Sequence, residues 1–141
     1  MDTWSSVSRA IAPLPVTEPY LSTLISDHKT YIIRDMKPLE FVGSSLEDLK
    51  GFPAEARRAA GFELGFVQRG LEPSDWKLMK EVGAGAREIR IHVLGEWRVL
   101  YVAKFARAVY VLHAFQKKTQ KTRREDIELA RKRYRQIGDR S

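Results

Sequence analysis

The sequence contains no cysteine, and none of its apolar runs approaches the roughly 20 residues that a membrane-spanning helix needs. Without cysteine there is no disulfide framework and no thiolate zinc site, so we expect a protein of the reducing cytoplasm. The N-terminus has no basic head followed by an apolar block, so no secretory signal is predicted. The three histidines are scattered and no carboxylates lie at metal-ligand spacing, so we expect neither a metal nor a cofactor.

The motifs of conventional hydrolases are absent as well, including the glycine-rich phosphate loop and the Gly-x-Ser-x-Gly nucleophile turn. The chain is rich instead in positive charge, with a formal net charge of +7. From Lys117 to Arg135 there are nine basic residues and three acidic ones. Such a block predicts a polyanionic partner, which could be nucleic acid, an acidic protein or a membrane surface. The alternative is a basic helix that is only solvated.

Two regions are expected along the chain. Residues 1–35 are rich in serine and proline, carry a balance of −1, and are interpreted as a partly irregular N-terminal extension. Residues 36–141 carry +8, begin with the domain-like sequence MKPLEFVG, and are long enough for one domain with a real core.

The patterns in the second region predict a small α+β domain, in the order strand, two helices, three strands and a helix. With caps included, the expected elements are 38–42, 44–50, 53–69, 88–93, 97–104, 108–115 and 122–136. The helix over 53–69 has an apolar stripe formed by Ala56, Ala60, Leu64, Val67 and Leu71.

Local signals refine these boundaries. Ser44 with Glu47, and Thr122 with Glu125, have the spacing of capping boxes at helix N-termini. Residues 72–85 are predicted to be a connection, with Trp76, Leu78 and Met79 under the sheet edge.

The three strands in the second half are predicted to form an antiparallel meander, because the links between them are short. Polar and apolar residues alternate from Glu88 to Val93, which is typical of a sheet with one buried face. The run 108–115 is almost wholly apolar and is therefore expected to be central in the sheet.

Basic side chains gather on these strands: Arg90 and His92, then Arg98, then His113 near the end of the last strand. Arginine binds phosphate through two parallel hydrogen bonds, and histidine exchanges a proton near pH 7. These groups suffice for RNA cleavage without a metal, in which a base activates the ribose 2′-OH and an acid protonates the leaving 5′ oxygen. The guanidinium groups would stabilise the charge that builds on phosphorus.

Each candidate also has a purely structural interpretation. Arg98 could pair with Glu96, and a histidine such as His113 in an apolar strand is more often a hydrogen-bonded core residue. His92 is expected to be exposed and without a role, and Lys117 to Lys121 could be a solvated turn. Aromatic residues that could stack on a base, or belong to the core, are Trp97, Tyr101 and Phe115.

Several segments resemble the phage-derived, HigB-like branch of the RelE/HigB toxin superfamily. They are REIRI (87–91), WRVLYVAKF (97–105) and above all YVLHAFQKKTQKT (110–122), which DIELARKRY (126–134) follows. The segments MKPLEFVG (36–43) and VQRGLEPSDWK (67–77) are similar to that branch too, so the resemblance covers about residues 36–137.

The resemblance implies a RelE-like fold: an N-terminal strand and two helices, an antiparallel sheet meander, and a C-terminal basic helix. It also implies the toxin of a type II toxin–antitoxin pair, a metal-independent endoribonuclease that cuts mRNA in the ribosomal A site and so inhibits translation. The expected partners are the ribosome, mRNA and a cognate antitoxin, often of helix-turn-helix type, with DNA reached only through the antitoxin and no membrane partner.

The resemblance also implies roles for individual residues. Arg98 corresponds to the strand arginine of the active site, Lys117 or Lys118 to the basic position after the last strand, and His113 to a strand histidine of this branch. We therefore predict Arg98, His113, Lys117 and Arg90 as catalytic residues. The predicted RNA-binding residues are Arg87, Lys104, Lys118, Lys121, Arg123 and Arg124. The C-terminal tyrosine of RelE has only Tyr134, well along the last helix, as a counterpart.

Two other functions stay open. One is a non-catalytic RNA- or ribosome-binding translation inhibitor, in which the basic face binds but no group transfers a proton. The other is a DNA-binding accessory of a toxin–antitoxin repressor. A recognition helix should present polar residues that read bases, whereas the last helix carries mainly arginine and lysine, so this function has the least support.

Overall fold

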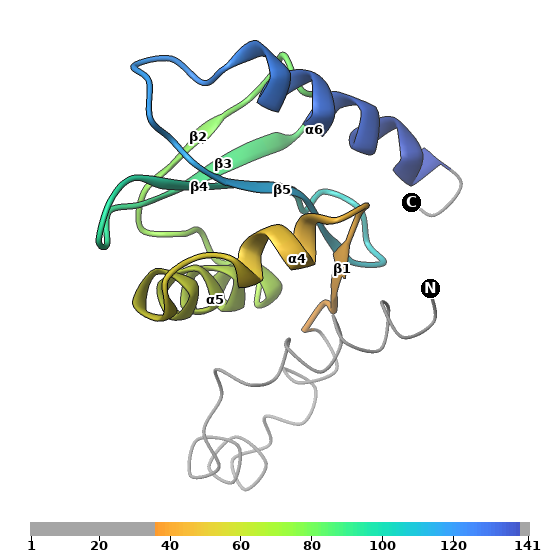
Figure 1. Cartoon of the computed structure of the whole chain (residues 1–141). Helices are drawn as coiled ribbons and strands as arrows, with labels where there is room; N and C mark the ends of the chain where they lie inside the picture. Colours follow the sequence, from red (N-terminus) through yellow and green to blue (C-terminus); the bar gives the residue numbers. More distant parts are fainter. Residues whose placement is uncertain (1–35, 139–141) are drawn as a thin grey trace, which may run out of the picture.

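A computed structural model describes residues 36–138, and the predictions made for residues 1–35 lie outside this range. The described chain forms a five-stranded sheet with α4 and α5 on one face and α6 on the other (Figure 1). The elements are β1 (Leu39–Phe41), α4 (Ser45–Lys50), α5 (Ala54–Gln68), β2 (Trp76–Leu78), β3 (Ala86–Ile91), β4 (Trp97–Val102), β5 (Val109–Gln116) and α6 (Arg124–Ile137). This is the α+β class that the sequence predicts. None of these helices is long and apolar enough to cross a membrane.

The strand order in the sheet is β1-β5-β4-β3-β2. The predicted meander is confirmed, because β3, β4 and β5 pair in antiparallel fashion one after the other. β5 lies between β1 and β4, as its apolar sequence predicts. The sheet as a whole is mixed, however, because β1 pairs with β5 in parallel.

The layer of α4 and α5 supplies the larger apolar core. Ala56, Ala60, Leu64 and Val67 of α5 are buried at helical spacing, as predicted. Leu71 does not belong to this stripe: it is 55% exposed, because α5 ends at Gln68 and the chain turns away there.

Three further expectations are corrected. The connection 72–85 contains β2, which pairs with β3 and is too short for a strand pattern to show in the sequence. Within this segment Met79 is buried, but Leu78 is 48% exposed rather than under the sheet. The capping boxes do not form: the Ser44 hydroxyl donates to Asp48, and the N-cap residue of α6 is Arg123, not Thr122.

The sheet also has two covered faces instead of one. The second face lies under α6, which contributes Ala130 and Ile137 to a core with Leu100 and Leu112. Alternation along β3 therefore does not separate core from solvent, and Glu88, on the nominally polar side, is 1% exposed. The charged groups buried beneath α6 form part of the candidate site.

Candidate functional site

The predicted site residues fall into two groups that lie apart. Arg90 pairs across the sheet with Arg98, and Arg98 with Phe115, so these residues share one end of the sheet on the α6 face. The amide of Lys117 donates to the carbonyl of Glu96 at 2.7 Å, which places the segment after β5 at the same end. Arg87 and Lys104 lie towards the other end, because Arg87 pairs with Tyr101 near the end of β4, shortly before Lys104.

We call Glu88, Arg98, His113 and Asp126 the α6-face cluster; each is at most 6% exposed. Residues 117–124 are the basic segment; they comprise the link from β5 to α6 and the first residue of α6 (Figure 1). Two residues of the cluster flank this segment in sequence, since His113 precedes it on β5 and Asp126 follows it in the first turn of α6.

Arg98 is held within the protein through Nη1, while its buried Nε has no hydrogen-bond partner among residues 36–138. Its Nη1 donates to Glu96 Oε1 at 3.1 Å and to the carbonyl of Trp97 at 3.0 Å. Its Nε lies 3.8 Å from Glu88 Oε1. The structural alternative of an Arg98–Glu96 pair is therefore confirmed, and Nη1 can turn to a phosphate if Glu96 gives way.

Glu88 is the centre of the cluster and was not among the predicted residues. Its Oε1 lies 3.6 Å from Nε of Arg90 and 3.8 Å from Nε of Arg98, while Thr122 donates its hydroxyl to Oε2 at 3.3 Å. Two arginines and a residue of the basic segment thus meet one buried carboxylate. The sequence contains a partial signal for this, because Glu88 and Arg90 share one side of a strand two residues apart.

His113 is held by acidic residues from both helical layers. Its Nε2 donates to Asp126 Oδ1 at 2.8 Å, its Nδ1 lies 3.8 Å from Asp48 Oδ2, and its ring stacks on Phe115 with centroids 4.9 Å apart. A β-bulge at Leu112 shifts the register of β5 immediately before His113. This is the hydrogen-bonded core histidine of the structural interpretation, with Nδ1 free of any hydrogen bond within residues 36–138.

His92 is exposed, as expected, but it is not without partners. Its two ring nitrogens each lie 2.8 Å from a carboxylate oxygen, one of Asp75 and one of Glu96. Hydrogen bonding to Asp75 and then to Glu96 raises the pKa of His92 above 6.5. His92 thus completes a ring of alternating charges that joins both arginines of the site. The members in order are Glu88, Arg90, Asp75, His92, Glu96 and Arg98.

The basic segment supplies the accessible cations. Lys118 and Lys121 are exposed and have no acidic partner within the part of the chain that the structure describes. Arg123 and Arg124 are also exposed; Arg123 Nε donates to Asp126 Oδ2 at 3.2 Å, which raises the pKa of Arg123. Lys117 is half-buried beside the β3–β4 hairpin. Phosphate groups of RNA could therefore reach the segment without any rearrangement.

The second group, Arg87 and Lys104, lines a cavity of about 290 Å³ on the α5 side of the sheet. Arg87 points to the face opposite Arg90, because the two residues are three positions apart along β3. Neither residue adjoins the basic segment.

Within residues 36–138, no group of three or more histidine, aspartate or glutamate side chains could hold a metal ion.

A mixed sheet between helical layers, with a basic corner on one face, is compatible with a RelE-like fold. Residues 47–135, which are more than half of the chain, match the family model described as Phage derived protein Gp49-like (DUF891). The chain therefore belongs to this family of RelE/HigB-like toxins. Membership implies a cognate antitoxin as a partner. No curated protein matches the chain.

Proposed function

We propose that this protein is the toxin of a type II toxin–antitoxin pair, close to the HigB branch, and that it cleaves mRNA in the ribosomal A site. One observation carries the proposal: the exposed basic segment runs directly from the strand of His113 to the helix turn of Asp126. Groups that can bind phosphate and a group that can transfer a proton therefore lie on one continuous stretch of chain.

The contacts support a role for each of these residues. Lys118, Lys121 and Arg124 would bind the RNA backbone first, because they are exposed cations. Arg90, whose side chain is 33% exposed, would then contact the scissile phosphate. His113 would exchange a proton through Nδ1, since Asp126 already holds Nε2.

Arg98 would reach the phosphate by exchanging one partner for another. The Glu96 side chain is 46% exposed and lies on the β3–β4 hairpin, so it can turn to solvent at little cost. A phosphate in its place would keep Nη1 hydrogen-bonded while Nε stays beside Glu88. Stabilisation of the charge on phosphorus would then depend on Arg98.

The test is induced expression of the full chain in a bacterium, with mRNA 5′ ends mapped a few minutes later. We expect growth arrest and new in-frame cuts with the natural sequence, and a loss of cleavage of about 100-fold or more with Arg98→Ala. Arg58→Ala, an exposed arginine on α5 away from the cluster, is the matched control and should cut normally. Circular dichroism of each purified variant verifies the fold.

A non-catalytic translation inhibitor is the second candidate, favoured by the burial of Arg98 and His113. It predicts growth arrest without new mRNA ends, and equal ribosome binding by the natural chain and His113→Asn. Normal growth with soluble, folded protein would contradict both candidates. A groove-reading DNA-binding role has less support, because Arg131 and Arg133 on α6 bind backbone carbonyls of this same domain.

A further inference from the structure

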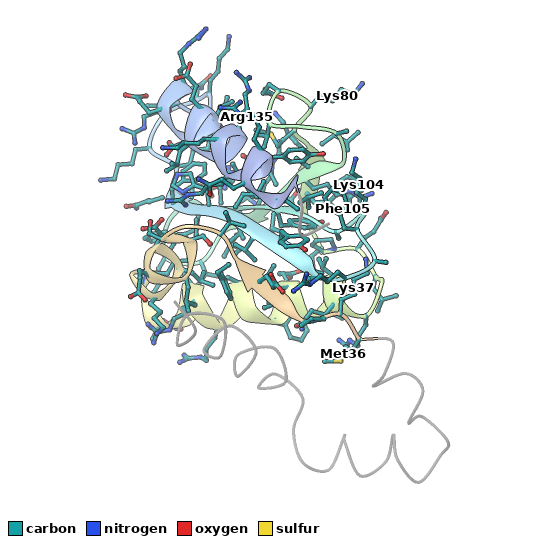
Figure 2. The ribbon with its side chains drawn as sticks, turned by 90° about the vertical axis from the view of Figure 1, so that its right-hand side faces the viewer. Met36, Lys37, Lys80, Lys104, Phe105 and Arg135 are labelled. Carbon is teal, nitrogen blue, oxygen red and sulfur yellow. The ribbon has the colours of Figure 1, made fainter. Side chains whose placement is uncertain are left out.

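The cavity beside Arg87 and Lys104 lies apart from the α6-face cluster, and its lining is strongly cationic. Lys37, just before β1, is its third basic residue, and Glu72 is the only carboxylate among its described lining residues. Figure 2 shows Lys37, Lys104 and Phe105 along one edge of the molecule. At about 290 Å³ the cavity is near the lower end of the size range of small-molecule sites, roughly 300–1,000 Å³.

The cations of this cavity are positioned by the protein but not fully neutralised. Arg87 lies over the Trp76 ring, 4.1 Å from its centroid. Its Nη1 forms a long ion pair, at 3.8 Å, with the exposed carboxylate of Glu72. Lys104 is exposed and has no acidic partner within residues 36–138. Lys37 Nζ donates to the carbonyls of Ala103 and Phe105, which leaves one of its three N–H groups to bind a ligand.

Tyr101 adds a neutral polar group to the wall. It is 1% exposed and pairs with Arg87 across the sheet. Burial raises the pKa of its hydroxyl, although the hydrogen bond with Arg87 works in the opposite direction. The hydroxyl therefore stays protonated at neutral pH and can donate to an anion.

We propose that this cavity binds the phosphomonoester of a nucleotide, either a free mononucleotide or the phosphorylated end of an RNA strand. The three basic residues and Glu72 give the lining a net charge of +2, which matches the charge of about −1.5 to −2 on a phosphomonoester at pH 7. A ligand with a single carboxylate would compensate only part of the net charge of the lining. The guanidinium fork of Arg87 suits the several oxygens of a phosphate, and Val67 and Leu71 offer an apolar wall to a base or ribose.

This inference does not depend on cleavage activity, because the cavity and the α6-face cluster share no residue. A protein that cuts nothing could still bind a nucleotide here. The two proposals can therefore fail separately.

The test is isothermal titration of the full chain with uridine 3′-monophosphate and uridine 5′-monophosphate, beside uridine, inorganic phosphate and glutamate. We expect a monophosphate to bind more tightly than inorganic phosphate, and uridine and glutamate to bind much more weakly. Lys104→Gln should weaken binding about three- to tenfold, the effect of one partly exposed charge-assisted hydrogen bond. Lys80→Gln is the matched control, since Lys80 is exposed and outside the lining (Figure 2).

A short RNA with a terminal phosphate distinguishes the two sources of the ligand. Tighter binding than the mononucleotide would identify an RNA end, and equal or weaker binding would identify a free nucleotide. The proposal is wrong if no monophosphate binds at millimolar concentration, or if Lys80→Gln weakens binding as much as Lys104→Gln. Preference for glutamate would overturn it too, and would point to an acidic protein segment as the occupant.

Discussion

The two faces of the sheet bury different kinds of side chain. Under α4 and α5 the strands contribute an apolar core, including Phe41, Ile89 and Val99. Under α6 the same strands bury apolar residues next to ionisable ones, including Glu88 and Arg98. The boundary between the faces runs through single strands, so neighbouring residues belong to different environments.

The two faces are expected to contribute differently to the stability of the fold. A buried charge costs free energy unless it is paired, and even a paired one contributes little net stability compared with an apolar residue of similar size. Stability alone therefore does not explain the charges of the α6 face, and clusters of this kind are typical of functional sites. The α4–α5 face contributes the larger apolar core, whereas the α6 face combines a second apolar core with the charged cluster.

The largest effect is expected on the apolar face. Leu64→Ala removes a fully buried side chain of α5 and leaves a cavity against the sheet. The free energy of unfolding should fall by about 2–5 kcal/mol. Urea denaturation followed by circular dichroism measures the change.

Phe62→Ala on the same helix is the control for that substitution. Phe62 is 55% exposed and contacts Phe66 edge to face, so its loss should cost less than about 1 kcal/mol. Equal costs for the two substitutions would show that α5 does not pack on the sheet through Leu64.

A smaller effect is expected from Glu88→Gln on the α6 face. The substitution keeps the shape of the side chain but leaves the buried guanidinium of Arg98 without its inner carboxylate. The cost should be about 1–3 kcal/mol. Glu96→Gln removes the half-exposed partner of the same arginine and should cost at most about 1 kcal/mol.

A double-mutant cycle sharpens this comparison. The Arg98→Met background has no guanidinium at position 98 that the loss of Glu88 could leave unpaired. Glu88→Gln should therefore cost less in this background than it does alone. Additive costs would mean that Glu88 serves only Arg90 and Thr122, and that the cluster is not a unit.

Periodicity predicts the parts of this fold that depend on local pattern. The stripe of α5 and the three strands of the meander were expected from the sequence within a few residues of their observed bounds. β2 and the parallel pairing of β1 were not, because three-residue strands show no period and strand order is set by packing. Thr122 has the sequence of a helix cap, but its hydroxyl binds Glu88, 34 residues away.

The same limit applies to the site. The positions of Arg98 and His113 on adjacent strands follow from the pattern, but their partners do not. Asp126 meets His113 only because α6 folds back over the sheet, and acidic residues at a helix start are ordinarily explained by the helix dipole. Arg90, predicted as catalytic, and Arg87, predicted to bind RNA, point to opposite faces of β3.

The smallest effect is expected at His92, on the edge between the two environments. Its folded-state pKa is raised, so its contribution to stability is fully present below pH 6.5 and is lost as the pH rises through the raised value. The side chain is 52% exposed, so solvent screening keeps the contribution small. The difference in unfolding free energy between the natural chain and His92→Gln should therefore be larger near about pH 5.5 than near about pH 8.5.

High salt provides the control, because it should reduce the difference at the lower pH and leave it unchanged at the higher one. The groups that face His92 are Asp75 and Glu96, and both also contact an arginine of the site. Deprotonation of His92 would free these carboxylates to hold Arg90 and Arg98 more tightly. A difference that does not vary with pH would show that His92 does not bridge the two carboxylates in solution, and that the ring of charges is open at this point.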